Sequence, residues 1–255
     1  MKKSSVFLAL FLICLAIACA HQEFKRLTLP VEDITSLEIR CGAGSLEIEG
    51  SSSTTIDVRA EIIIENTDQK DAQALIRDKM KLSLERDGDK AVLVAGFEET
   101  SGLRIFGNRL INLTVGLPRD LDLKVEDGSG NIELSGIRGD IDIDDGSGSI
   151  RIGDIGGNAV INDGSGDIEL SGIRGDIDID DGSGEIVVND GGGFIGIRDG
   201  SGSISVTNVV GDVEISDGSG SIRIDGVEKN VTIKDDGSGS VDISGVKGRI
   251  SKPPK

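Results

Sequence analysis

A four-residue motif, Asp-Gly-Ser-Gly, recurs seven times in the second half of the chain and restricts the fold more than any other feature. The motifs begin at Asp127, Asp145, Asp163, Asp181, Asp199, Asp217 and Asp236. Successive motifs are 18 residues apart, except that the last interval is 19 residues. A fixed period of this length is typical of solenoids, in which each repeat packs only on its neighbours.

Each repeat contains two short segments in which aliphatic and polar residues alternate. Counted from the Asp as position 1, the aliphatic sites are positions 6 and 8, as at Ile132 and Leu134, and positions 15 and 17, as at Ile141 and Ile143. This alternation indicates half-buried strands, and the glycines at positions 2 and 4 supply the turn between them. We therefore predict a mainly β fold, a single-stranded parallel β-solenoid (β-helix) of about seven 18-residue coils over residues 127–251.

The residues before the repeats, 21–126, are predicted to form an N-terminal α+β cap, because an open coil would expose a bare strand edge. Within this region residues 41–50 match the repeat as a degenerate first coil, with Cys41 at the Asp position and Leu46 and Ile48 in the aliphatic columns. Cys41 is expected to be a buried small residue.

A long excursion separates this first coil from the others. It is expected to hold strands at 55–64, 80–85, 91–96 and 110–115 and a short amphipathic helix that starts at residue 66 or 67. The tail at 252–255 contains two prolines, which cannot continue a strand ladder.

Residues 1–20 read as a secretory signal peptide, since two lysines precede an apolar run at 6–18 that is too short to span a membrane. Leu15 to Cys19 is similar to a bacterial lipobox, in which Cys19 would carry the lipid. Ala18-Cys19-Ala20 is also a small-x-small cleavage site, which would release a soluble protein that begins at His21. Both alternatives place the protein outside the cytoplasm, as an outer-membrane lipoprotein of the cell envelope or as a periplasmic or secreted protein.

Composition excludes several classes of function. A net charge of −18 argues against nucleic-acid binding, which relies on basic residues. The chain has no Trp or Tyr for stacking sugars or bases, and its single His leaves little scope for His-based catalysis or metal clusters. Its three cysteines provide no disulfide framework, because two of them lie in or beside the signal.

Three features of the sequence together resemble a known family. They are the segment Leu117 to Gly130 that leads into the repeats, the Ser-Gly-x-Ile repeats, and the upstream strand–helix region. The chain resembles the putative adhesin family known as domain of unknown function 4097 (DUF4097), and is similar to the head-GIN putative adhesins. The resemblance covers residues 30–250 and implies a β-solenoid on an exported or envelope-associated bacterial protein. It supplies no catalytic residues.

The aspartates of the motif are the first candidate site. We expect each carboxylate to accept a hydrogen bond from the N–H of the Ser two residues on, as in an Asx-turn. The alternative is a cation ladder along the stacked carboxylates, for which Ca²⁺ is the candidate ion. The spacing differs from that of the calcium-binding nonapeptide repeat, so no metal site is assigned and no cofactor is expected.

Phe194 is the second candidate, because it stands where other coils carry Asp or Asn. We expect its ring to fold back over the gap left by Gly191, which replaces an inward aliphatic residue; an exposed ring would instead mark a contact patch. The outward acidic stripes are expected to keep the protein soluble, and they offer a face for a cationic partner as the alternative.

These observations predict a non-enzymatic envelope or surface protein, an adhesin-like scaffold whose partner is an unknown protein or envelope component. It is expected to bind no nucleic acid and to touch the membrane only through a lipid anchor. A divalent-cation-dependent assembly module is one alternative. A polysaccharide-degrading β-helix enzyme is another, which the absence of long inserted loops and sugar-stacking aromatics in the repeats disfavours.

Overall fold

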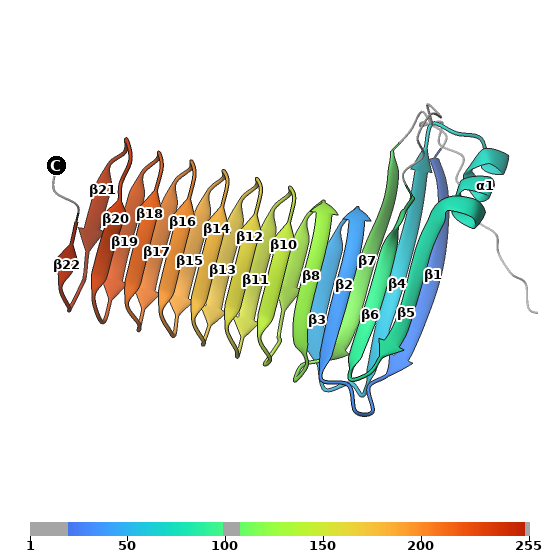
Figure 1. Cartoon of the computed structure of the whole chain (residues 1–255), viewed down its shortest axis with the longest axis horizontal. Coiled ribbons are helices and arrows are strands. Elements are labelled where there is room, and N and C mark those ends of the chain that lie inside the picture. Colours follow the sequence, from blue (N-terminus) through green and yellow to red (C-terminus); the bar gives the residue numbers. More distant parts are fainter. Residues whose placement is uncertain (1–19, 99–107, 253–255) are drawn as a thin grey trace, which may run out of the picture.

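The 18-residue repeat folds into stacked coils whose strands form two sheets that run the length of the molecule (Figure 1). We describe a computed structural model, which covers residues 20–98 and 108–252. Each coil contributes one strand to each sheet, so the predicted β-solenoid is confirmed. The signal segment 1–19, with Cys19, lies outside the described residues, as does most of the predicted tail.

The first sheet, sheet A, has eleven strands. In spatial order they are β1 (Ala20–Pro30), β4 (Thr55–Glu65), β7 (Arg109–Pro118), β3 (Leu46–Ser51), β9 (Ile132–Ser135), β11 (Ile150–Ile155), β13 (Ile168–Ile173), β15 (Ile186–Gly191), β17 (Ile204–Val209), β19 (Ile222–Val227) and β21 (Val241–Ser244).

The second sheet, sheet B, also has eleven strands. In the same direction along the molecule they are β5 (Met80–Asp87), β6 (Lys90–Phe97), β2 (Ser36–Ala43), β8 (Asp122–Ser129), β10 (Ile141–Asp145), β12 (Ala159–Asp163), β14 (Ile177–Asp181), β16 (Ile195–Asp199), β18 (Val213–Asp217), β20 (Val231–Asp235) and β22 (Ile250–Ser251).

The coils stack in register, and this places like residues in columns. In sheet A, Ile132 lies beside Ile150, which lies beside Ile168, all in parallel strands. These side chains are at most 1% exposed. The core is thus a set of aliphatic ladders between the two sheets, stabilised by burial of apolar surface in every coil.

The glycine at position 4 of each motif lets neighbouring coils approach closely. At Gly148 φ is +135°, and a Cβ atom there would lie 1.7 Å from the carbonyl oxygen of Gly130 in the preceding coil. No side chain fits such a gap, so the turn requires glycine for conformation and for space.

The first coil is formed by β2 and β3 and stacks directly on β8 and β9, although a long excursion separates them in the chain. Cys41 pairs with Asp127 and Leu46 with Ile132, which is the alignment that the degenerate repeat predicts. The excursion leaves the first coil at Ser51 and returns at Asp122.

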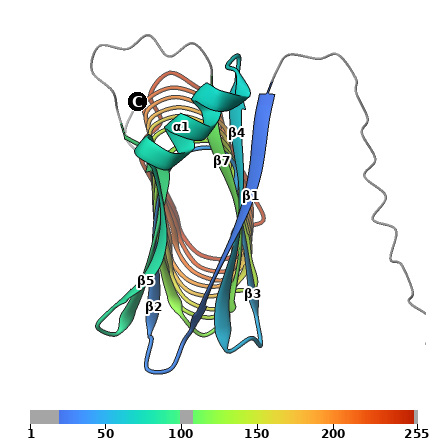
Figure 2. The same cartoon turned by 90° about the vertical axis from the view of Figure 1, so that its right-hand side faces the viewer.

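The excursion extends both sheets at the N-terminal end. In sheet A, β4 runs antiparallel to β7 and to β1; in sheet B, β6 continues parallel to β2 and then pairs antiparallel with β5. The helix α1 (Gln69–Lys79) lies across this end and buries Ala72 and Ile76 (Figure 2). It begins slightly later than predicted, because the Asp68 side chain accepts the N–H of Asp71 and caps the helix.

The C-terminal end of the rod is less regular. The pairing of β18 with β20 shifts after Ile215, where the longer last repeat places its additional residue. The final strand, β22, ends at Ser251, before the prolines. In the part of the chain that the structure describes, no helix is both long and apolar enough to cross a membrane.

Candidate functional site: the aspartate column and the outer faces

Six aspartates of the repeat form a continuous column that crosses sheet B at the C-terminal ends of its strands. Each lies at or near the end of its strand and pairs in register with the Asp of the next coil, from Asp127 to Asp217. They are 1–7% exposed and are the only charged residues in the buried core of the described chain. The column consists of Asp127, Asp145, Asp163, Asp181, Asp199 and Asp217.

One oxygen of each carboxyl group caps the turn. In the five coils from Asp145 to Asp217, Oδ1 accepts the N–H of the Ser two residues on, at 2.9–3.3 Å. At Asp127 it accepts the N–H of Gly128 at 2.9 Å. The five bonds from Ser are those that the Asx-turn prediction requires, and Asp127 departs from it.

The other oxygen of each group has no partner. All six Oδ2 atoms are buried and make no hydrogen bond. Because burial disfavours a charged carboxylate, the pKa values of all six are raised above their ordinary value. Burial and the neighbouring Asp carboxylates raise the pKa of Asp145 to about 6, and the pKa of Asp181 is likewise about 6.

The two ends of the column differ from its middle. At the N-terminal end Cys41 occupies the Asp position beside Asp127 and is half-buried, and burial raises the pKa of its thiol. At the C-terminal end the turn is capped differently. Asp235 is exposed and accepts the N–H of Gly237 at 3.0 Å, and it lies opposite Ser216 because the additional residue of the last repeat shifts the register at this point.

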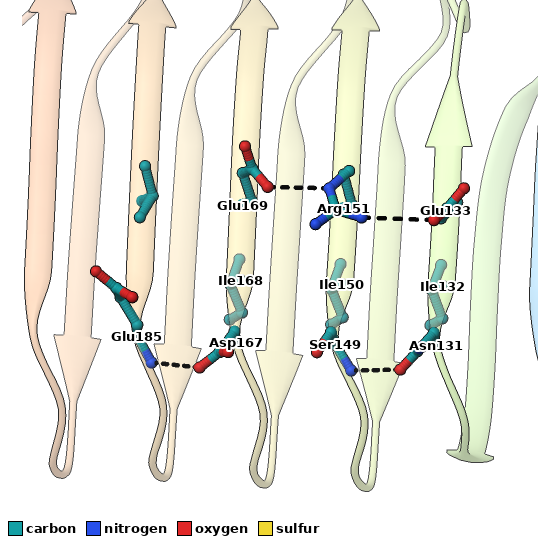
Figure 3. Close-up of a pocket in the computed structure, with 11 residues that line it drawn as sticks. Asn131, Ile132, Glu133, Ser149, Ile150, Arg151, Asp167, Ile168, Glu169 and Glu185 are labelled. Atoms are coloured by element: carbon teal, nitrogen blue, oxygen red, sulfur yellow. Dashed lines mark hydrogen bonds and ion pairs between the residues drawn. The ribbon is translucent and has the colours of Figure 1, made fainter.

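The outer face of sheet A carries charges of alternating sign in adjacent coils. Arg151 lies between Glu133 and Glu169 of the adjacent coils, at 3.4 Å and 2.9 Å (Figure 3). These residues line a surface depression of about 190 Å³. All three side chains are at least half exposed, so the pairs contribute little to stability.

The outer face of sheet B is more acidic. Arg198 bridges Asp178 and Asp180 of the preceding coil, at 3.1 Å each. Val160 stands on the same face and is 41% exposed. The face thus presents carboxylates with isolated apolar groups among them.

A second polar column, at position 14, was not predicted from the sequence. Here an Asp or Asn side chain accepts the backbone N–H of the same position in the next coil, as between Asp140 and Asn158 at 2.7 Å and between Asn158 and Asp176 at 2.9 Å. The recurrence of Asp or Asn at this position was the signal that could have revealed it. Phe194 occupies the same column and has no acceptor to offer the next coil.

Phe194 does not cover Gly191, so that prediction is wrong. Ile195 fills the gap instead, since its Cδ1 atom lies 2.7 Å from the position that a Cβ of Gly191 would take. The Phe194 ring lies outside over Gly196, with Cε1 3.1 Å from the position that a Cβ of Gly196 would take, and Phe194 is 42% exposed. Val210 of the next coil, whose N–H donates to the Gly191 carbonyl, is 56% exposed. The ring turns outward because Ile195 already occupies the interior.

Among residues 20–98 and 108–252, no three His, Cys, Asp or Glu side chains are placed to hold one metal ion. In the aspartate column an ion between two coils would meet a pair of carboxylates and no third acidic group.

The comparison with protein families agrees with this architecture. The model described as Toastrack DUF4097 matches residues 34–245, which include the first coil, the excursion and nearly all of the repeats. The chain belongs to the Toastrack DUF4097 family. The resemblance drawn from the repeat motif is thereby confirmed. No curated protein matches the chain.

Several solved structures are similar to this Toastrack chain. A protein described as a putative lipid binding protein from Parabacteroides distasonis is 17% identical, with a TM-score of 0.45; the match covers 91% of this chain and 97% of that one. A putative adhesin from Bacteroides fragilis is 14% identical over the same shares, with a TM-score of 0.40. A putative cell adhesion protein from Clostridium sporogenes is 14% identical, with a TM-score of 0.31, and the match covers 93% of this chain and all of that one.

Proposed function

We propose that this Toastrack protein is an exported, non-enzymatic component of the bacterial cell envelope, an adhesin-like scaffold that binds a partner through the outer face of sheet B. The observation that carries this proposal is Phe194. A column that otherwise links coils through Asp and Asn is interrupted there by an exposed aromatic ring. At this position other coils have a side chain that accepts a structural hydrogen bond, and here it is replaced by an exposed apolar ring. Contact with a partner explains this replacement better than a role in folding does.

The chemistry around Phe194 indicates the kind of partner. Between residues 140 and 217 the outer face of sheet B presents eight acidic residues and one basic residue, Arg198. The acidic residues are Asp140, Asp142, Asp144, Asp176, Asp178, Asp180, Asp212 and Glu214. A partner that offers basic side chains around an apolar group would complement both the carboxylates and the ring.

The partner hypothesis is tested with a photo-crosslinking residue at the exposed Val210, which stacks on the coil that contains Phe194, in the full-length protein in intact envelopes. We expect one defined crosslinked species that disappears in Phe194→Asn. The matched control carries the crosslinker at Ser205, on sheet A, and should not give that species. Crosslinking that is equal at both positions, or that survives Phe194→Asn, would contradict the proposed contact.

The anchor is a separate part of the proposal. Strand β1 begins at Ala20, so a lipid on Cys19 would join the rigid fold with no linker between them. This would hold the N-terminal end of the rod at the membrane and leave the coils free to meet a partner. Labelling with palmitate should therefore mark the wild-type protein and be lost in Cys19→Ser; labelling that persists in the variant excludes the lipoprotein form and favours another route of attachment.

A further inference from the structure

The buried aspartate column has a feature that turn capping does not explain. Capping uses one oxygen of each carboxyl group, whereas the second oxygen of all six is buried without a hydrogen bond. A buried carboxylate with an unsatisfied oxygen is costly, and six of them in register would repel one another across the strand spacing of about 4.8 Å.

The groups that face the column do not neutralise it. In the described residues, the titratable groups that act on these carboxyls are the neighbouring column aspartates, Cys41 at one end, and Asp235 and Asp236 at the other. The residue after each of the six is glycine, and the residue two positions before it is isoleucine or valine. The residue directly before it lies on the outer side of the strand and is partly or fully exposed; these residues are Glu126, Asp144, Asn162, Asp180, Arg198 and Ser216. No Lys, Arg or His of this part of the chain forms an ion pair with the six aspartates.

Two kinds of species can reduce the repulsion between the carboxylates of such a column: a metal ion or protons. An ion held between two coils would have two carboxylates and, at 1–7% exposure of the aspartates, little access to water for its remaining ligands. A proton needs only one oxygen to bind and another to accept its hydrogen bond. The geometry therefore favours protons.

We propose that the aspartate column holds protons taken up from solvent, so that neutral and charged carboxyl groups alternate along the solenoid and link neighbouring coils. In this arrangement a proton adds to the Oδ2 of one Asp, and the resulting O–H donates to the carboxylate of the next coil. In an alternating pattern Asp145 and Asp181, which lie two coils apart with Asp163 between them, are protonated together.

The proposal makes the stability of the solenoid depend on pH in an unusual direction. The pKa values of Asp145 and Asp181 rise from 3.8 to about 6 on folding, so the folded protein retains protons that the unfolded chain releases. The stabilisation is therefore complete below about pH 4 and is lost as the pH rises through about 6. Most carboxylates that are paired in the native state act in the opposite direction.

The decisive experiment compares the melting temperature of the full chain at pH 5.0 and pH 7.5 with that of Asp145→Asn/Asp181→Asn. The Asn side chain keeps the oxygen that caps the turn and adds N–H donors toward the neighbouring carboxylates. We expect the wild type to melt higher at pH 5.0 by roughly 5 °C or more. The double variant should lose most of this difference and melt higher than the wild type at pH 7.5.

A general loss of surface repulsion at low pH must be separated from this effect. The matched control is Asp142→Asn/Asp144→Asn, which changes the net charge equally on the exposed face of the same sheet. It should retain the pH dependence, and that dependence should persist in 0.5 M NaCl, about the concentration at which surface charges are strongly screened. Infrared difference spectra should show a protonated carboxyl signal near pH 6 that is reduced in Asp145→Asn/Asp181→Asn.

Two results would overturn the proposal. One is a pH dependence that disappears equally in the exposed control variant or in salt. The other is a rise in the melting temperature of the wild type with millimolar CaCl₂ at pH 7.5 that chelator reverses and that the column variant lacks, since an ion and not protons would then occupy the column.

Discussion

At the scale of single residues, the fold depends most on glycines that sit where two coils touch. Gly166 has a φ of +144°, and a Cβ atom there would lie 1.7 Å from the carbonyl oxygen of Gly148. The positive φ disfavours any side chain, and the carbonyl oxygen belongs to the backbone, which cannot move aside as a flexible side chain could. Gly153 is different, since the nearest atom to its Cβ position is the Oγ of Ser171 at 3.5 Å, an ordinary contact.

We therefore expect Gly166→Ala to lower the free energy of unfolding by about 3 kcal/mol or more, through strain and through separation of the coils. Gly153→Ala should change it by no more than about 0.5 kcal/mol, because the alanine fits an ordinary strand position. Denaturant titrations of the two variants measure the difference. Equal losses would mean that the close approach of the coils does not limit the turn.

At the scale of elements, two kinds of contact between coils can be ranked. The position-14 column pairs a side-chain oxygen with a backbone N–H of the next coil, whereas the Arg151 pairs join exposed flexible side chains. Asn158→Ala should cost about 1 kcal/mol, since it removes the acceptor for the N–H of Asp176. Arg151→Ala should cost less than about 0.5 kcal/mol and only at low salt. Melting at two salt concentrations tests the ranking, which a larger loss for Arg151→Ala would reverse.

Substitution of Phe194 can restore a hydrogen bond that the position-14 column lacks in the native protein. Phe194→Asn supplies an acceptor for the N–H of Asp212, in the way that Asp140 does for Asn158. We expect a gain of up to about 1 kcal/mol in stability, offset in part by exposure of Gly196. Thermal melting should show an unchanged or higher melting temperature. A clearly lower value would show that the ring serves the fold, and would remove the reason for treating it as a contact residue.

The elements also show how far the sequence could be interpreted. Strand positions, inward residues and the stacking of residues 41–50 on the repeats follow from local spacing, because each coil repeats one pattern. The antiparallel joining of β1, β4 and β7 depends on pairs distant in sequence, which no local pattern encodes. The filling of the Gly191 gap by Ile195 depends on packing, and the capping of the last turn by Asp235 depends on one additional residue, so both emerged only from the structure.

At the scale of the whole molecule, the excursion between the first coil and the second serves as a cap. It adds antiparallel strands at the N-terminal edges of both sheets and places α1 across the end of the rod (Figure 2). The described C-terminal end has only the short strand β22 beyond β20. Contacts between neighbouring coils link each repeat to the next, which favours unfolding of the coils as one cooperative unit.

This view predicts that a whole coil can be removed. Deletion of residues 163–180 joins Asn162 to Asp181, so that the coil of Asp181 stacks on that of Asp145 with the aliphatic columns, turn glycines and aspartate column still aligned. The shortened protein should fold, melt in a single transition at a lower temperature, and show a denaturant m value reduced in proportion to the surface removed. Circular dichroism and urea titration measure both quantities.

The matched control deletes only residues 163–171, which is half a coil. Strands that belong to sheet A would then follow the path of sheet B, and the Asp-Gly-Ser-Gly turn would meet the opposite turn of its neighbour, where the glycines are spaced differently. We expect the coils after the deletion to lose their β-structure. The aliphatic sites of the two strands would still face inward, but Ile173 would fall at the position of a turn glycine, where a Cβ has no room, and Asp181 would leave the aspartate column. If the 18-residue deletion unfolds the protein as completely as the 9-residue one does, the coils are not interchangeable units, and the cap and the rod must instead be specified by contacts particular to each coil.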